Sequence, residues 1–236
     1  MNDGMNGDVP VSESNLDGKM NYGMALLNDA PCGPEATIVA TGLGRSGTTM
    51  LARIMEEAGL EMGKKLTTST REIKRLQSFI KTKERLTFKS FCKKQSRLTP
   101  KWGFKLPSFR YVMREYESSI FSPRFVVIFR DILSISLRRN ISQGDELLPA
   151  MRFAIQDYLR LLEQVQKVKS PVLLISYEKS LQYPERTVAA MLDFMGISLT
   201  EERIAEIAKS AVHNANPDYL LLRSSSKEAP DGKSEN

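Results

Sequence analysis

Residues 37–51 contain the feature that most constrains the fold: an apolar stretch, a glycine-rich loop and then a helical pattern. The stretch is rich in β-branched residues, Gly42, Gly44 and Gly47 follow it, and apolar side chains recur at three- and four-residue steps from Met50. A helix N-terminus after such a loop attracts anions, because its first backbone N–H groups lack partners and carry partial positive charge. The stretch therefore predicts an α/β protein with a phosphate-binding loop.

The spacing from Gly42 to Gly47 matches a nucleotide P-loop, but the cation stands in a different place. In the ATP and GTP form a lysine follows the second glycine, whereas this chain has Thr48 there and carries Arg45 inside the loop. The sequence Gly-x-Gly-Arg-Ser-Gly-Thr-Thr resembles the 5′-phosphate loop of the sulfotransferases that use 3′-phosphoadenosine 5′-phosphosulfate (PAPS). The resemblance implies that Arg45 stabilises charge on the oxygen that leaves sulfur. It also implies that the donor is bound by Gly44, Arg45, Ser46, Gly47, Thr48 and Thr49.

The length of 236 residues fits one domain with a substantial core. We expect flexible tails at 1–34 and 224–236, with a short ordered piece at 22–27, around a sulfotransferase-like α/β domain at 35–223. The lack of a long apolar run or a secretory signal favours a cytoplasmic protein without a membrane span. The formal charge of +6 suits an anionic donor, although nucleic acid or an acidic membrane surface would be attracted equally.

Cysteine and histidine are scarce, which limits the chemistry that the chain can support. Cys32 and Cys92 are too few for a disulfide framework, so we expect free thiols in a reducing cytosol. His213 is the only histidine, so a histidine-based metal cluster or a Ser-His-Asp triad is hard to build. We therefore expect no metal. The sulfotransferase resemblance implies the same, because PAPS has no β,γ-phosphate pair for Mg²⁺ to bridge.

Apolar stretches and helical patterns alternate along the rest of the chain. Residues 61–100 are strongly basic, and their spacing predicts one or two amphipathic helices at the rim of an anion site. Further strands are predicted at 102–107, 124–129 and 171–176, helices at 111–120, 150–169, 184–195 and 201–211, and a loop at 141–149. This alternation predicts a parallel β-sheet covered by helices on both faces, with ligands at the carboxyl ends of the strands.

Arg130 directly follows the predicted strand at 124–129. In the sulfotransferases an arginine at this point binds the 3′-phosphate of the donor together with a serine some eight residues later, and a guanidinium fork suits two phosphate oxygens. Here Arg138 stands at the serine's position, and Ser136 comes earlier. The resemblance implies Arg130 as a donor-binding residue, with Ser136 or Arg138 as its partner and Ser142 as a weaker option.

A third resemblance lies in residues 172–178, where a strand ends in Tyr177 and Glu178 before a helix that ends at Phe194 and Gly196. The same succession follows in the sulfotransferases, so the resemblance covers roughly residues 36–200. We interpret this block as scaffold, with Glu178 able to orient the loop.

The acceptor needs a base to take its proton, and the sulfotransferases use histidine or glutamate. In the bacterial-type branch that this chain resembles, an acidic residue follows the first helix and loop; Glu72 is the nearest match, with Glu61 and His213 as alternatives. Lys105 matches a lysine of the same branch that follows a Trp-Gly-aromatic run, and the resemblance implies a contact with the transferred sulfonate.

The resemblance implies an enzyme that transfers a sulfuryl group from PAPS to a hydroxyl or amine, with a sugar or polysaccharide precursor as the expected acceptor and 3′-phosphoadenosine 5′-phosphate (PAP) as the product. One alternative is a P-loop kinase that uses ATP and Mg²⁺, with Asp131 as a metal ligand. Another is a non-catalytic relative that binds nucleotide. A nucleic-acid partner is not expected, because the basic segment lacks the interleaved aromatic residues of a recognition module.

Overall fold

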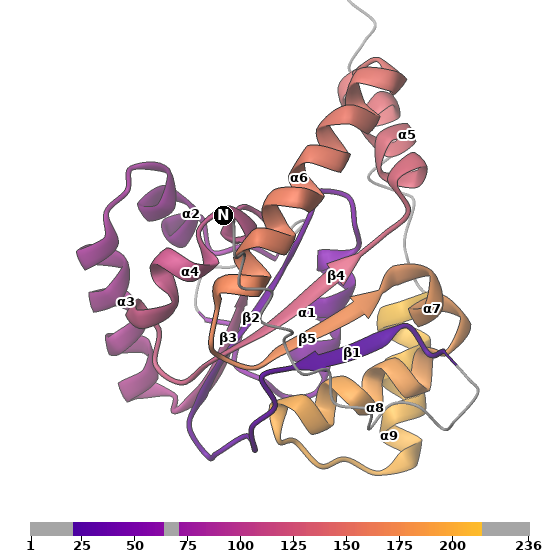
Figure 1. Cartoon of the computed structure of the whole chain (residues 1–236). Helices are drawn as coiled ribbons and strands as arrows, with labels where there is room; N and C mark the ends of the chain where they lie inside the picture. Colours follow the sequence, from indigo (N-terminus) through magenta and orange to yellow (C-terminus); the bar gives the residue numbers. More distant parts are fainter. Residues whose placement is uncertain (1–20, 64–70, 214–236) are drawn as a thin grey trace, which may run out of the picture.

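The computed structural model describes residues 21–63 and 71–213, which form a five-stranded sheet covered by helices (Figure 1). The strand order is β1-β5-β4-β2-β3, and only β1 runs antiparallel to its neighbour. The strands are β1 (Met24–Leu27), β2 (Ala36–Gly42), β3 (Lys101–Lys105), β4 (Pro123–Phe129) and β5 (Val172–Ser176). Every residue of β2 is buried, as expected of a strand with helices on both faces.

Two hydrophobic cores fill the space between the sheet and its helices. Figure 1 shows α2, α3, α4 and α6 on one face and α8 and α9 on the other. The helices are α1 (Thr48–Glu57), α2 (Lys74–Lys81), α3 (Arg85–Leu98), α4 (Met113–Tyr116), α5 (Ile132–Gln143), α6 (Leu147–Lys167), α7 (Tyr177–Gln182), α8 (Pro184–Met195) and α9 (Glu201–Ile207). Short helical segments are η2 (Pro107–Tyr111), η3 (Glu117–Ser119) and the π-helix η4 (Ala208–His213).

The chain order places a crevice at the carboxyl ends of β2 and β4. After β2 the chain continues through α1 toward β3 on one side, and after β4 it continues through α5 and α6 to β5 on the other. Neighbouring strands whose connections leave in opposite directions mark the place where open α/β sheets bind ligands. The glycine-rich loop and Arg130 follow these two strands, so both lie at this crevice.

The fold confirms the predicted α/β class and differs from the expected elements in three places. β1 lies within the short ordered piece expected at 22–27, but it pairs with β5, so the sheet begins before residue 35, where the domain was expected to start. The predicted loop at 141–149 is mostly helical, because α5 continues to Gln143 and α6 starts at Leu147. Pro149 is tolerated in the first turn of α6, because a backbone N–H there would have no partner within the helix. The predicted helix at 111–120 is broken into η2, α4 and η3. The remaining tail residues expected at 1–20 and 224–236 lie outside the described residues.

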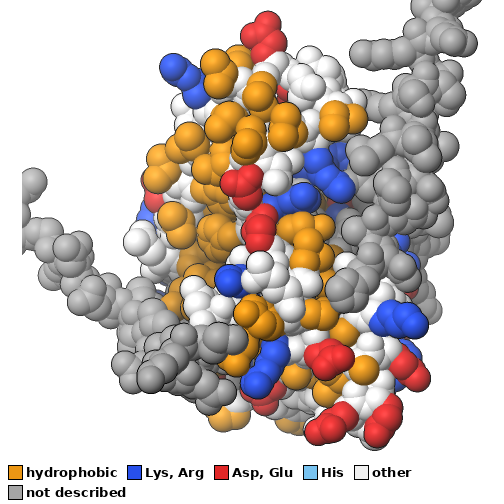
Figure 2. Space-filling view, turned by 90° about the vertical axis from the view of Figure 1, so that its right-hand side faces the viewer, with side chains coloured by type: hydrophobic (Ala, Val, Ile, Leu, Met, Phe, Trp, Pro, Cys, Tyr) orange, Lys and Arg blue, Asp and Glu red, His pale blue; other side chains and the backbone are white. Residues whose placement is uncertain are grey.

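Helices α5 and α6 form a hairpin that stands out from the sheet (Figure 1). The outer face of this hairpin carries exposed apolar side chains. Figure 2 shows hydrophobic side chains gathered over the upper part of the molecule, where these two helices lie. They include Leu133, Leu137, Ile141, Leu148, Ile155, Leu159 and Leu162, which are between 42% and 71% exposed. In the part of the chain that the structure describes, no helix is both long and apolar enough to cross a membrane.

Candidate functional site

At two positions the glycine-rich loop has a backbone conformation that only glycine adopts without strain. Gly47 has φ +104°, and a Cβ there would lie 2.4 Å from the ring of Tyr177. Gly42 has φ +154°, and a Cβ there would lie 2.7 Å from the carbonyl oxygen of Ile128. Both glycines therefore let the loop pack closely against β4 and α7, which fixes the position of the α1 N-terminus at the crevice.

Ser46 shapes the loop from within. Its hydroxyl and its backbone N–H both donate to the carbonyl oxygen of Leu43, at 2.7 and 3.2 Å, and the residue is fully buried. A donor phosphate would therefore meet the neighbouring N–H groups at the start of α1 rather than the Ser46 hydroxyl. Thr48 is also largely buried, whereas Thr49 is half-buried at the first turn of α1.

Arg130 follows β4 and contacts the glycine-rich loop directly. Its Nη1 donates to the carbonyl oxygen of Arg45 at 3.1 Å, and its guanidinium lies 4.2 Å from the centroid of the Tyr177 ring. Its Nε is buried and has no hydrogen-bond partner among the described residues. A buried guanidinium N–H without an acceptor fits an arginine that binds a ligand oxygen.

The backbone of Arg130 is clamped by Tyr158 of α6. The Tyr158 hydroxyl accepts a hydrogen bond from the Arg130 N–H at 2.8 Å and donates one to the Arg130 carbonyl at 2.7 Å. Burial raises the pKa of Tyr158 to about 12, so the hydroxyl keeps the proton that it donates. Glu178 accepts a hydrogen bond from the N–H of Asp131 at 3.0 Å, so a second side chain fixes the same turn. The sequence suggested that Glu178 could orient the glycine-rich loop, whereas its hydrogen bond is with the turn after β4. Sequence reasoning missed Tyr158, which is hidden in the apolar pattern of α6.

Ser136 and Arg138, the two residues that the sequence offers as partners of Arg130, lie in different surroundings. Ser136 is fully buried, and its hydroxyl donates to the carbonyl of Ile132 at 2.8 Å. Arg138 is half-buried, and its pKa lies below the ordinary value because of burial and because of the nearby positive charges of Arg130 and Arg45. The structure therefore brings Arg45, Arg130 and Arg138 into one cationic group, whereas Ser136 faces the protein interior.

Lys105 and Glu72, which come from distant parts of the sequence, form an ion pair. Lys105 Nζ donates to Glu72 Oε1 at 2.8 Å, with the side chains 3% and 15% exposed. The two residues also form an isolated parallel β-bridge, which extends the edge of the sheet beyond β3. Burial lowers the pKa of Lys105, the attraction of Glu72 opposes that shift, and the charge of Arg45 adds to it. The pair is therefore within electrostatic reach of the glycine-rich loop.

Of the other two candidates for the base, Glu61 lies elsewhere on the sheet, and the side chain of His213 is not among the described ones. Glu61 is exposed and forms a backbone bridge with Trp102 at the far end of β3. His213 ends η4, and its side chain is outside the described part of the structure. Of the two candidates whose side chains are described, Glu72 is the one that the fold brings to the same side as the loop.

We predict that Glu72→Gln lowers the free energy of unfolding by roughly 3 kcal/mol, because it removes the carboxylate that pairs with the buried Lys105 ammonium. The pKa of Lys105 should fall further, since the attraction that opposes the burial shift is lost. Urea denaturation measures the change in stability. The double variant Glu72→Gln/Lys105→Met should recover most of the loss, and an unchanged midpoint for the single variant would contradict the pairing.

Asp131, the metal ligand of the kinase alternative, caps α5. Its carboxylate accepts a hydrogen bond from the N–H of Ser134 at 2.8 Å, and the residue is exposed. Within residues 21–63 and 71–213, no group of three or more His, Cys, Asp or Glu side chains is placed to hold a metal ion. The structure thus gives Asp131 a role in helix capping.

The sheet order, the glycine-rich loop after β2 and the arginine after β4 define an α/β protein of the P-loop type with a candidate anion site at the crevice. No protein-family profile and no curated protein sequence matches the chain. Solved structures do match, and they show that the chain has the sulfotransferase fold. A sulfotransferase domain from the curacin biosynthetic pathway superposes with a TM-score of 0.53 at 12% identity, over 86% of this chain and 95% of that domain.

Two further solved structures agree with this fold. The sulfotransferase domain of the Synechococcus PCC 7002 olefin synthase gives a TM-score of 0.52 at 13% identity, over 88% of this chain and 93% of that domain. Sulfotransferase STF9 from Mycobacterium avium gives a TM-score of 0.50 at 11% identity, over 78% of this chain and 70% of that protein. At these identities the structural likeness establishes the fold alone, so any proposed activity rests on the site residues.

Proposed function

We propose that the protein is a sulfotransferase that transfers a sulfuryl group from PAPS to a hydroxyl or amine. The observation that carries this proposal is the contact between Arg130 and the carbonyl of Arg45 at 3.1 Å, which joins two cationic elements from neighbouring strands at one crevice. A ligand with two separate phosphate groups matches this arrangement, because the α1 N-terminus suits one phosphate and the Arg130–Arg138 pair suits the other. In PAPS these are the 5′- and the 3′-phosphate.

PAPS, when bound, supplies a sulfuryl group whose bond to the 5′-phosphate oxygen breaks as a new bond to the acceptor oxygen or nitrogen forms. The N–H groups at the start of α1 hold the 5′-phosphate in place. Arg45 stabilises the negative charge that the phosphate oxygen retains with the bonding electrons. Glu72 accepts the proton that the acceptor loses, and Lys105 fixes the orientation of the Glu72 carboxylate through their ion pair.

Two alternatives make different predictions for ligand binding. A kinase would need a cation at the exit of the loop, where this chain has Thr48, and the Asp131 carboxylate is engaged at the N-terminus of α5. A non-catalytic relative would bind PAP weakly and show no turnover; the grouping of Arg45, Arg130 and Arg138 and the electrostatic effect of Arg45 on the Lys105–Glu72 pair support the enzyme instead. A carbohydrate acceptor and a cytoplasmic location are part of the proposal and rest on the sequence resemblance.

The proposal predicts that PAP stabilises the protein against heat, because a ligand that binds only the native state adds stability. At a hundredfold excess over its Kd, PAP should add about 2.7 kcal/mol and raise the Tm by roughly 5–10 °C. A thermal-shift titration with PAP, repeated with EDTA, measures this effect, and ATP with Mg²⁺ is the comparison. Stabilisation by ATP and Mg²⁺ alone would favour the kinase, and no response to PAP would refute the proposed donor.

A further inference from the structure

A cavity of about 220 Å³ lies against the glycine-rich loop. The loop forms one wall through Leu43, Gly44 and Arg45, and the other walls come from η2, α5 and α6. Because Arg45 belongs both to this cavity and to the cationic group of the crevice, a molecule in the cavity would lie beside the group that PAPS transfers. The position is therefore suited to the acceptor, an assignment that rests on the proposed function.

The polar lining of the cavity is mainly cationic. Arg45, Arg110 and Arg139 line it together with one carboxylate, that of Asp157. The remaining lining includes apolar side chains such as Leu43, which is nearly fully buried. A cavity of this size with three guanidinium groups favours a small anionic molecule over a neutral one of the same shape.

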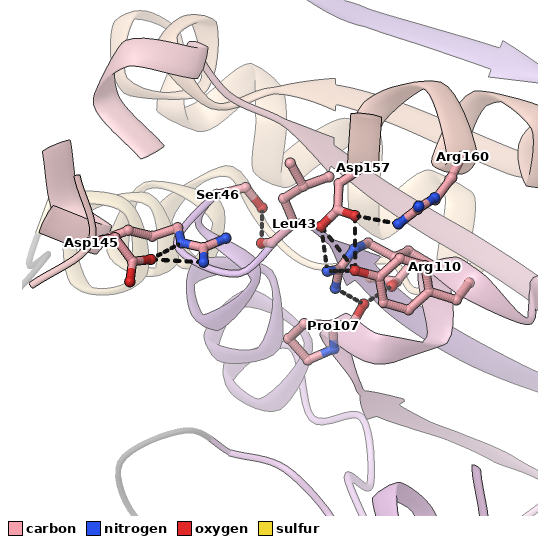
Figure 3. A network of polar contacts seen from close by, with 10 residues as sticks. Leu43, Ser46, Pro107, Arg110, Asp145, Asp157 and Arg160 are labelled. Carbon is pink, nitrogen blue, oxygen red and sulfur yellow. Dashed lines mark hydrogen bonds and ion pairs between the residues drawn. The ribbon is translucent and has the colours of Figure 1, made fainter. Parts of the chain in front are cut away.

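Arg110 is held rigidly in this lining. Its Nη2 and the Tyr111 hydroxyl both contact the Asp157 carboxylate, at 2.8 and 2.9 Å, and its Nη1 donates to the carbonyl of Pro107 at 2.9 Å. Figure 3 shows the Asp157 carboxylate facing both Arg110 and Arg160. Asp157 therefore contacts two arginines, of which Arg110 lines the cavity and Arg160 is largely exposed beside it.

Arg139 on α5 is held by a contact that a ligand can replace. Its Nε and Nη2 donate to the Asp145 carboxylate at 2.8 and 2.7 Å, and the two side chains are 31% and 34% exposed. An ion pair this exposed contributes little stability, typically about 0–1 kcal/mol. Arg139 can thus exchange Asp145, of which it contacts only Oδ2, for a carboxylate on a molecule in the cavity at low cost, and its planar guanidinium suits both oxygens of that carboxylate.

We propose that the cavity binds an acceptor that carries a carboxylate next to the hydroxyl that receives the sulfuryl group, as in a uronic acid, and that Arg139 selects this carboxylate. The apolar outer face of the α5–α6 hairpin is not part of this selection. Leu133, Leu137 and Ile141 lie two residues from the cavity-lining positions Ile135 and Arg139, which places them on the opposite side of α5.

The test compares p-nitrophenyl β-D-glucuronide with p-nitrophenyl β-D-glucoside, which differ in the carboxylate. Their dissociation constants are measured by calorimetry on the PAP complex of the full chain. The glucuronide should bind at least about tenfold more tightly. Arg139→Gln should remove this preference, whereas Arg152→Gln, at an exposed position on the same hairpin, should keep it.

Equal or weaker binding of the glucuronide by the wild type would overturn the assignment, as would a preference that survives in Arg139→Gln. The titration with PAP itself separates this result from a failure of the proposed function. If PAP binds and the glucuronide shows no advantage, the donor site stands and the carboxylate selection by Arg139 is refuted. If PAP does not bind, the proposed function fails first, and the acceptor assignment fails with it.

Discussion

Replacement of Arg45 by glycine should lower the rate of sulfuryl transfer by roughly 10²- to 10³-fold, because the charge that forms on the departing phosphate oxygen loses its stabilising guanidinium. Glycine is the informative substitution, since Arg45 has φ +72°, a conformation that a residue without a Cβ keeps without strain. The affinity for PAP should fall only modestly, because the N–H groups of α1 remain. The rate of PAP release from PAPS, followed by chromatography, measures the effect on transfer.

The variant Arg45→Lys is the matched control for this prediction. It keeps the positive charge and loses the planar fork, so its rate should lie between those of the wild type and Arg45→Gly. Arg45 also lies near Arg138 and Lys105, whose pKa values it lowers. If Arg45→Gly released PAP at the wild-type rate, the residue would have a purely structural role, and the catalytic assignment would be wrong.

The elements that sequence reasoning placed correctly are those that local patterns encode. A buried parallel strand, a glycine-rich turn and an amphipathic helix each leave a signature within about ten residues, so the loop at Gly42–Gly47 and the position of Arg130 could be predicted. The pairing of Lys105 with Glu72 could not be derived from such patterns. The two residues meet only because the segment before α2 adds a bridge to the sheet edge next to β3.

The contacts that hold Arg130 were not predictable for a different reason. Tyr158 lies in the middle of α6, where an aromatic residue at helical spacing indicates a core position. Its hydroxyl reaches the backbone of Arg130 because α6 packs across the end of β4, and the stacked rings of Tyr158 and Phe129 fix the approach. Likewise Ser136 lies only two residues before the position at which the sulfotransferases have a serine. The turn of α5 nevertheless places Ser136 in the interior and leaves Arg138 at the crevice. Side-chain direction depends on the tertiary packing, which the spacing alone does not contain.

Replacement of Arg130 by alanine should weaken the binding of PAP by about 2–3 kcal/mol, or roughly 30- to 150-fold, because charge-assisted hydrogen bonds to the 3′-phosphate are lost. Adenosine 5′-monophosphate lacks that phosphate, so its affinity should change little. The ratio of the two dissociation constants, measured by calorimetry, therefore reports the 3′-phosphate contact and cancels any general loss of stability. Equal losses for the two ligands would contradict the assignment of Arg130.

The same ratio tests whether the clamp on Arg130 matters for binding. Tyr158→Phe removes both hydrogen bonds to the Arg130 backbone and keeps the ring that stacks on Phe129. If the clamp aligns the guanidinium, this variant should lower the preference for PAP over adenosine 5′-monophosphate by about 1 kcal/mol, less than Arg130→Ala does. Arg97→Ala, at an exposed position on α3, should leave the ratio unchanged. A normal ratio in Tyr158→Phe would mean that the stack on Tyr177 and the contact with the Arg45 carbonyl suffice to hold Arg130 in place.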